Sequence, residues 1–175
     1  QALEADLSIE LGLIAPAFAV TPVQVAIAFR DARGNRLDRS RFDLVLPADA
    51  LGRARVRPLA YDVACESHPL NNLRVLRYLV QDMKVSEDDK NRWYRHWVET
   101  GLETLERQLA DPRSGRFCHG DTPTLADICL VPQIFNAQRF DCKLDHVQRV
   151  MKVFEACMVL PAFDSTQPSK CPDAE

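Results

Sequence analysis

The chain has 175 residues, which suits one domain with a substantial core, or one domain with part of a second, and excludes a large multidomain enzyme. Hydrophobic residues make up 46% and charged residues 27%, so neither wholesale disorder nor a fibrous fold is expected. A formal net charge of -3 gives no basic surface for nucleic acid, and we expect no nucleic-acid partner.

No membrane partner is expected either. The longest apolar stretch, Leu11–Val20, is interrupted by Gly12 and Pro16 and is about half as long as a bilayer span. Because no basic region precedes this stretch, we expect no signal peptide. The first residue is Gln1 rather than Met, so we expect a chain that is processed or incomplete at its start.

The cysteines indicate a reducing compartment. No short C-x-x-C pair and no metal-ligand spacing occurs, so neither a zinc site nor a thioredoxin-type redox motif is expected. Several cysteines fall on apolar helical faces, where a reduced thiol behaves as a small hydrophobic group. We therefore expect reduced thiols in a cytoplasmic protein, the alternative being a disulfide framework. The six are Cys65, Cys118, Cys129, Cys142, Cys157 and Cys171.

The first part of the chain has the pattern of strands and turns. Short apolar runs at Leu7–Ile14, Val23–Phe29 and Phe42–Leu46 predict three strands. Between the last two runs, Gly34-Asn35 predicts a hairpin turn.

After Pro47 the apolar residues recur with helical periodicity. Asp49 predicts the cap of a helix that begins at Ala50 and continues to about Val80, as one bent helix or two, because Pro58 and Pro69 interrupt it. Ser86 is followed by three acidic residues, and this pattern predicts the start of a second helix, which ends at Asp111-Pro112. Its expected apolar face is Trp93, Trp97, Leu102, Leu105 and Leu109.

Two further helices complete the predicted fold. One begins at Thr124, and the other covers about Val147–Leu160, with an apolar stripe of Val147, Val150, Phe154, Cys157 and Met158. From Ser165 the chain is polar and is expected to form a surface tail. The predicted fold class is therefore mainly α, an all-α helical bundle preceded by a short segment of strands.

Thr124 and Asp127 predict a capping box at the start of the third helix. The Thr124 hydroxyl can accept from the Asp127 backbone N–H, while the Asp127 carboxylate can accept from the Thr124 N–H. Within the segment Gly-Asp-Thr-Pro-Thr-Leu-Ala-Asp (residues 120–127) this cap resembles that of the core helix in the helical C-terminal domain of glutathione transferases. The resemblance makes Thr124 and Asp127 structural rather than catalytic.

Further segments narrow the resemblance to one class. They are Leu-Pro-Ala-Asp-Ala-Leu-Gly-Arg-Ala (46–54), His-Pro-Leu-Asn-Asn-Leu-Arg-Val-Leu (68–76), Gly-Arg-Phe-Cys (115–118) and Leu-Val-Pro-Gln (130–133), followed by Asn136-Ala137 and Arg139-Phe140. Together they resemble the zeta class, the maleylacetoacetate and maleylpyruvate isomerases. The match covers about residues 44–175, which implies a glutathione-transferase helical domain there and an atypical segment at 1–43.

The resemblance implies an activity and a site. The family isomerises a cis double bond in a dicarboxylate by adding and eliminating the thiolate of glutathione. It implies glutathione as cofactor, a homodimer, a role in aromatic catabolism, and Arg139 as the anchor for a substrate carboxylate, a task that suits the planar guanidinium. The residues that would face glutathione are His68, Asn72, Leu73 and Arg74, although an ideal helix places Arg74 about 200° from Asn72.

The chain also departs from the family pattern. Zeta enzymes carry an N-terminal thioredoxin-like domain whose Ser-Ser-Cys type loop activates the thiol. No Ser-Ser or Ser-Cys pair precedes residue 60, and residues 1–43 are about half the length of that domain. Accordingly, no catalytic residue is assigned, and we expect this chain alone to have negligible activity. The sequence leaves three alternatives for residues 1–43: a native segment, a truncated domain, or a frame-shifted segment. The alternative function is a catalytically inactive helical domain that acts as a binding or dimerisation module.

Overall fold

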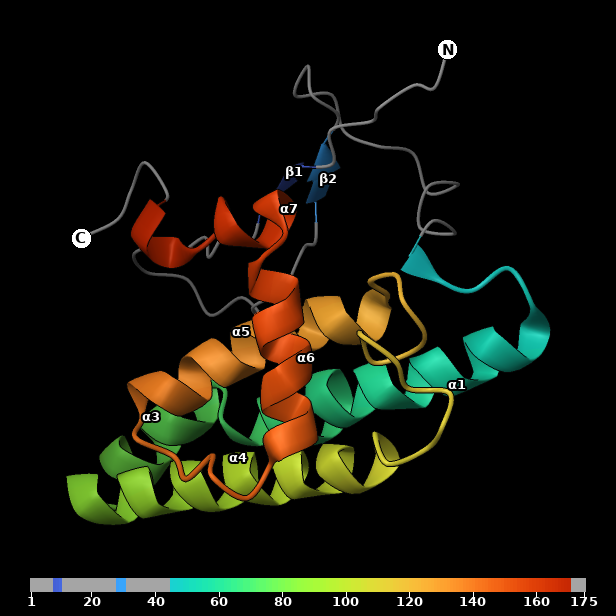
Figure 1. Ribbon diagram of the computed structural model, residues 1–175. Helices are drawn as coiled ribbons and strands as arrows, with labels where there is room; N and C mark the ends of the chain where they lie inside the picture. The colour runs from blue at the N-terminus through green and yellow to red at the C-terminus, as the bar shows by residue number, and fades with distance from the viewer. Residues whose placement is uncertain (1–7, 11–27, 31–44, 171–175) are drawn as a thin grey trace. The chain divides into compact units, whose positions relative to one another are not determined.

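The computed structural model describes residues 8–10, 28–30 and 45–170 (Figure 1). By its internal contacts the chain divides into two units. One is Gln1–Phe42 with Met158–Glu175, and the other is Asp43–Cys157. The described residues are mostly helical, so the prediction of a mainly α fold is confirmed.

The first unit contains one short antiparallel pair of strands. β1 (Ser8–Glu10) pairs with β2 (Ala28–Arg30), and Ile9 lies opposite Phe29. These strands fall at two of the predicted runs, whereas the hairpin turn at Gly34-Asn35 lies outside the described residues. The third strand was expected to end at Val45-Leu46, and neither of these two residues is in a strand.

Residues 161–170 contain two short helices, where a surface tail was expected from Ser165 onward. α7 (Pro161–Asp164) is followed by a 3-10 helix, η3 (Pro168–Lys170). Thr166 is buried, and its hydroxyl donates to the Ala162 carbonyl at 2.9 Å. The prediction of a polar tail from Ser165 is therefore wrong for Thr166, because a local helical turn gives its hydroxyl a backbone partner.

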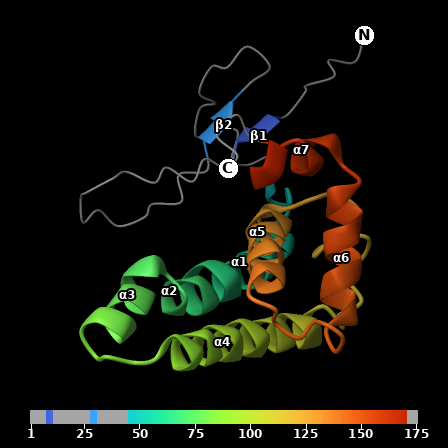
Figure 2. The same cartoon turned by 90° about the vertical axis from the view of Figure 1, so that its left-hand side faces the viewer.

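The second unit is a helical bundle. Its elements are α1 (Ala50–Tyr61), the π-helix η2 (Asp62–Ser67), α2 (His68–Leu70), α3 (Leu73–Gln81), α4 (Glu87–Gln108), α5 (Leu125–Arg139) and α6 (Gln148–Met158), whose last residue belongs to the first unit. α5 packs against α1, η2 and α4, while α4 also contacts η2, α2 and α3. Figure 2 shows α4 running along one edge of the bundle, past both α3 and α6.

The two prolines of the first predicted helix act differently. Pro58 lies inside α1 without ending it. Before Pro69 the helix widens to π spacing, and the His68 N–H donates to the Val63 carbonyl five residues back. This widening suits Pro69, which has no N–H and whose ring would clash with the carbonyl four residues before it in a regular α-helix. The chain then breaks at Asn71, and α3 begins with Asn72 as its cap. The segment is therefore two helical stretches rather than one bent helix.

The core face of α4 agrees with the predicted one at Leu102, Leu105 and Leu109 but differs from it at Trp93 and Trp97. Tyr94, Val98, Leu102 and Leu105 are the buried residues of this helix. Trp93 and Trp97 are half-buried and make an edge-to-face contact, with ring centroids 5.7 Å apart. The periodicity therefore predicted the helix and the later part of its core face, whereas Tyr94 and Val98 occupy the core positions that were expected for Trp93 and Trp97.

Small side chains let η2 approach α4 closely. A Cβ added to Gly101 of α4 would lie 2.0 Å from the Ser67 hydroxyl oxygen, closer than any non-bonded contact. Ser67 is itself only 6% exposed. The absence of a side chain at Gly101 is therefore a condition for this packing, which fixes the π-helix immediately before His68.

Candidate functional site

The stretch from α2 to the first turn of α3 carries four of the residues implicated by the sequence. His68 is half-buried, and its Nε2 atom is buried with no hydrogen-bond partner. Burial lowers the pKa of His68 below its ordinary value of 6.5, because desolvation disfavours the charged imidazolium. A neutral ring with an unused nitrogen can donate or accept one hydrogen bond, depending on its tautomer.

Asn72, Leu73 and Arg74 occupy the start of α3. The side-chain oxygen Oδ1 of Asn72 accepts from the Arg74 backbone N–H at 3.0 Å, so the side chain of Asn72 caps the helix. This leaves its amide nitrogen for other partners. Leu73 is 53% exposed and Arg74 is also exposed.

Asn71 is a candidate residue that the sequence analysis missed. Its side chain is only 9% exposed, and both amide atoms are buried without a hydrogen-bond partner. Together with His68 Nε2, three unsatisfied polar atoms therefore lie within four residues, a concentration that calls for an explanation. The sequence feature that could have indicated Asn71 is the pair Asn71-Asn72. Only one of two adjacent asparagines can cap α3, so the other must have a different role.

α4 holds this stretch in place. The indole nitrogen of Trp93 donates to the Leu70 carbonyl at 2.9 Å. This bond satisfies a carbonyl at the end of the short helix α2, where no helical partner exists. The half-buried Trp93 thus links the stretch to α4, which explains why this residue does not lie in the core.

Arg139 is the last residue of α5. It is exposed, and it makes no ion pair within residues 45–170. It lies on a different element from the other four predicted residues, and α4 contacts both α5 and the short helix that carries His68. The structure therefore places the predicted site residues in two groups: His68, Asn72, Leu73 and Arg74 in the stretch from α2 to α3, and Arg139 at the end of α5.

Thr124 and Asp127 form the capping box of α5. The fully buried Asp127 carboxylate accepts from the Thr124 backbone N–H at 2.7 Å and from the Thr124 hydroxyl at 2.8 Å. Its other oxygen accepts from the backbone N–H of Cys118 at 2.8 Å. One carboxylate therefore begins the helix and also holds the preceding loop against it.

The cysteines within the described ranges are all unpaired. Burial, together with the Asp127 charge, raises the pKa of Cys118 well above its ordinary value, and burial raises that of Cys129 to about 11. These thiols therefore stay protonated near neutral pH and are poor nucleophiles. No group of His, Cys, Asp and Glu able to hold a metal ion occurs among residues 8–10, 28–30 and 45–170.

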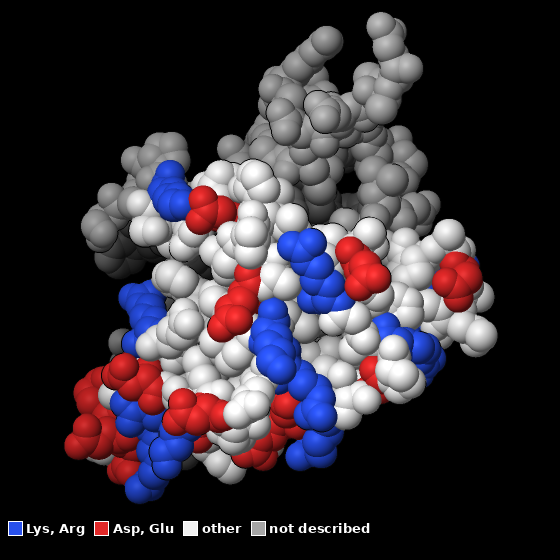
Figure 3. Space-filling model, viewed as in Figure 1, with Lys and Arg blue, Asp and Glu red and all other residues white. Residues whose placement is uncertain are grey.

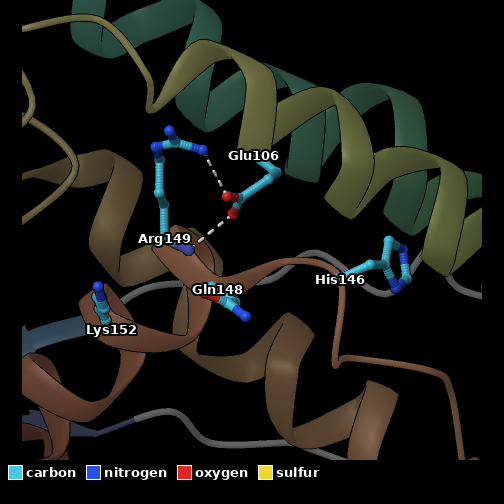
Figure 4. A pocket seen from close by; sticks show the side chains of 5 residues that line it. All are labelled: Glu106, His146, Gln148, Arg149 and Lys152. Carbon is cyan, nitrogen blue, oxygen red and sulfur yellow. Dashed lines mark hydrogen bonds and ion pairs between the residues drawn. The ribbon is translucent and has the colours of Figure 1, made fainter.

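One surface hollow of the described residues lies away from the predicted site residues. It has a volume of about 330 Å³ and is lined by Glu106, His146, Gln148, Arg149 and Lys152 (Figure 4). Glu106 accepts from the backbone N–H groups of Arg149 and Val150 at 2.8 and 3.0 Å and pairs with the Arg149 guanidinium at 2.9 Å. Because Glu106 of α4 caps the start of α6, this hollow is explained by helix packing.

The described surface mixes charges of both signs. On the face shown in Figure 3, Lys and Arg side chains lie beside Asp and Glu side chains. Several form local pairs, such as Arg92 with Asp89 at 2.8 Å. No helix in the described part of the chain is long and apolar enough to cross a membrane.

Acidification should destabilise the fold through His68. Because its pKa in the folded chain is below the unfolded value, the unfolded state binds more protons below about pH 6.5, and stability falls as the pH falls. Urea unfolding from about pH 8 to about pH 5 should therefore show a smaller loss of stability in His68→Gln than in the wild type. Equal losses in the two proteins would contradict this role of burial.

The helical bundle and its capped core helix define the class of protein. The family described as "Glutathione S-transferase, C-terminal domain" matches residues 91–158. A solved structure, maleylpyruvate isomerase from Pseudomonas aeruginosa PAO1, is 36% identical, covers 85% of this chain and 82% of that chain, and has a TM-score of 0.73. The chain belongs to the glutathione transferase family, and its relatives are zeta-class isomerases, as the sequence predicted.

Two further relatives are closer in sequence. Maleylpyruvate isomerase of a Ralstonia species is 45% identical over 131 residues, which are 74% of this chain and 62% of that protein. Maleylacetoacetate isomerase from Anaeromyxobacter dehalogenans 2CP-1 has a structure with glutathione in its active site, at 44% identity and a TM-score of 0.71, covering 75% of this chain and 59% of that one. The same enzyme has been solved with dicarboxyethyl glutathione and citrate. The chain spans about three fifths of the length of the curated relatives it matches.

Proposed function

We propose that this chain supplies the helical domain of a glutathione-dependent cis-trans isomerase that acts on maleylacetoacetate or maleylpyruvate. The observation that carries the proposal is the 45% identity to a maleylpyruvate isomerase over 131 residues. The structure of a second relative with dicarboxyethyl glutathione and citrate in its active site supports the same substrate class. The described part of this chain contributes binding and electrostatic groups.

Arg139 is the proposed anchor for a substrate carboxylate. Its guanidinium is exposed at the end of α5 and has no ion pair within residues 45–170, so both N–H edges can face a ligand. A planar guanidinium can donate two parallel hydrogen bonds to a carboxylate and keeps its charge at all relevant pH values. A fixed positive charge would also stabilise the negative charge that develops on a substrate oxygen during isomerisation.

The stretch from α2 to α3 is the proposed contact to glutathione. The unpartnered Nε2 of His68 and the unpartnered amide of Asn71 offer neutral hydrogen-bonding groups, which fit the peptide bonds of a tripeptide. Asn72 fixes the start of α3 through its cap, Leu73 offers an exposed apolar surface, and Arg74 offers an exposed cation for a carboxylate. When bound, glutathione supplies the thiolate that adds to the cis double bond and later leaves.

Two measurements on the purified chain test the proposed function. Calorimetry should detect glutathione binding, and an absorbance assay with maleylpyruvate and with maleylacetoacetate should detect any glutathione-dependent isomerisation. Turnover supports an isomerase. Glutathione binding without turnover favours the alternative, a catalytically inactive domain that acts as a binding or dimerisation module. Absence of both would reject a glutathione-dependent role for this chain.

Arg139→Ala should weaken the binding of a dicarboxylate substrate about 10- to 100-fold, since hydrogen bonds to a charged group contribute about 1.5–3 kcal/mol. The effect should appear in KM or in the dissociation constant, while glutathione binding stays unchanged. Arg92→Ala is the matched control, because Arg92 is an exposed arginine paired with Asp89 on α4. Equal dicarboxylate binding by wild type and Arg139→Ala would remove Arg139 from the site.

The proposed assembly is a homodimer. Five large apolar residues of the bundle are more than half exposed, and such side chains are typical of association surfaces when they cluster. They are Leu51, Tyr61, Leu73, Tyr78 and Met83. Sedimentation at micromolar concentration should give twice the chain mass of 19.8 kDa, and a monomer would contradict the proposal.

The proposed location is the cytoplasm, in the breakdown of aromatic compounds. The unpaired state of the five described cysteines suits a reducing compartment. The pathway follows from the two candidate substrates, which remain alternatives because they differ away from the shared maleyl end.

A further inference from the structure

The end of α5 is closed by a tight turn immediately after Arg139. The last turns of a helix lack backbone partners and tend to fray unless they are held. Here Asp141 adopts the left-handed conformation with φ 53°, and the Cys142 N–H donates to the Ala137 carbonyl at 2.9 Å. This is the hydrogen bond of a helix-terminating turn in which a left-handed residue follows the cap. The backbone at Arg139 is therefore fixed.

Three contacts from α4 hold this end of α5. The Tyr94 and Phe140 rings are stacked, with centroids 3.8 Å apart and planes 18° from parallel. The Arg95 Nε donates to the Phe140 carbonyl at 2.8 Å, and the Glu99 carboxylate accepts from the Lys143 backbone N–H at 2.8 Å. These contacts begin one residue after Arg139, so they restrain the position from which its side chain extends.

The charge of Arg139 also acts on Tyr94. Tyr94 is only 5% exposed, and burial raises its pKa to about 12, while the Arg139 charge acts against that rise. The phenol stays neutral near pH 7 and so adds no charge that would compete with a carboxylate for Arg139.

We propose that Tyr94 is a positioning residue that holds Arg139 in place for a substrate carboxylate. The inference rests on the proposed function, because it needs Arg139 to bind the substrate. Its physical basis is that a charge contributes most when neighbouring packing fixes it before the ligand arrives. Tyr94 provides this through the ring stack on Phe140, not by touching the substrate.

The test is a titration of the full chain with maleate, a cis-dicarboxylate that resembles the maleyl end shared by the two candidate substrates. Binding is followed by NMR at the arginine side-chain N–H signals. Arg139→Ala should weaken binding at least about 10-fold, and Tyr94→Leu about 5-fold. Tyr94→Phe keeps the ring stack and should restore binding to within about twofold of wild type. The double variant Tyr94→Leu with Arg139→Ala should bind no more weakly than Arg139→Ala alone, since Tyr94 acts through Arg139.

Controls separate positioning from folding. Arg92→Ala removes an exposed side chain from α4, the helix that carries Tyr94, and should leave maleate binding unchanged. Phe140→Leu removes the same stack from the α5 side, so it replaces Tyr94→Leu if that variant does not fold. If Arg139→Ala weakens binding while both stack variants bind as wild type does, the positioning role is rejected and the proposed function stands. If wild type shows no Arg139-dependent binding, the role of Arg139 is rejected, and the positioning role with it.

Discussion

Replacing Asp127 by alanine should lower the free energy of unfolding by about 3–4 kcal/mol, because each buried donor left without an acceptor costs about 1–3 kcal/mol. Three donors lose their partner: the backbone N–H groups of Cys118 and Thr124, and the Thr124 hydroxyl. The melting temperature should fall by about 8–15 °C for a chain of this size. Urea unfolding and calorimetry would measure the two quantities.

Two comparisons make the Asp127 prediction specific. Asp145→Ala removes an exposed carboxylate and should change stability by less than about 0.5 kcal/mol. Asp127→Asn keeps the shape and one acceptor, so its effect should lie between those of the two alanine variants. A loss in Asp127→Ala no larger than that in Asp145→Ala would show that the buried carboxylate does not hold the loop and helix together.

Gly101→Ala should destabilise the fold by about 1–3 kcal/mol, the usual cost of overpacking a core contact. In an unhindered helix the same change would stabilise by up to about 1 kcal/mol, because alanine is the better helix former. The sign reverses because the new Cβ would lie 2.0 Å from the Ser67 hydroxyl oxygen and 3.2 Å from the Ser67 Cβ, so the buried Ser67 side chain or the two helices must shift. Equilibrium unfolding in urea would measure the effect.

A second substitution should restore part of the stability that Gly101→Ala loses. Adding Ser67→Ala removes the hydroxyl oxygen and leaves the Ser67 Cβ at 3.2 Å from the new methyl group, so part of the loss should return. Thr100→Ala, at the exposed neighbouring position, should stay within about 0.5 kcal/mol of wild type. A stabilising Gly101→Ala would mean that η2 and α4 are not in close contact.

The starts of the main helices could be predicted because they depend on neighbours in sequence. Asp49 accepts from the Gly52 N–H at 2.7 Å, and Ser86 accepts from the Asp89 N–H at 3.1 Å, as the local pattern predicted. The capping box of Thr124 and Asp127 is equally local. What the pattern did not contain was the third partner of Asp127, the Cys118 N–H, since a loop residue nine positions away is placed by folding.

The candidate site was only partly accessible from sequence. The resemblance singled out His68, Asn72, Leu73, Arg74 and Arg139, but it did not distinguish the two asparagines. The structure assigns the cap of α3 to Asn72 and leaves the buried amide of Asn71 without a partner. Nor could periodicity show that Tyr94 stacks on Phe140, because the predicted face of α4 was that of Trp93 and Trp97.

The sequence by itself determined the helical class, the starts of the main helices, an interruption near Pro69 and the family, because caps, prolines and motifs act through residues close in the chain. The tertiary structure decided the π-helix before His68, the break at Asn71, the core residues in the first half of α4, and the restraint on Arg139. These depend on which side chains of distant segments meet, and a face of a helix becomes a core face only when a neighbouring helix covers it.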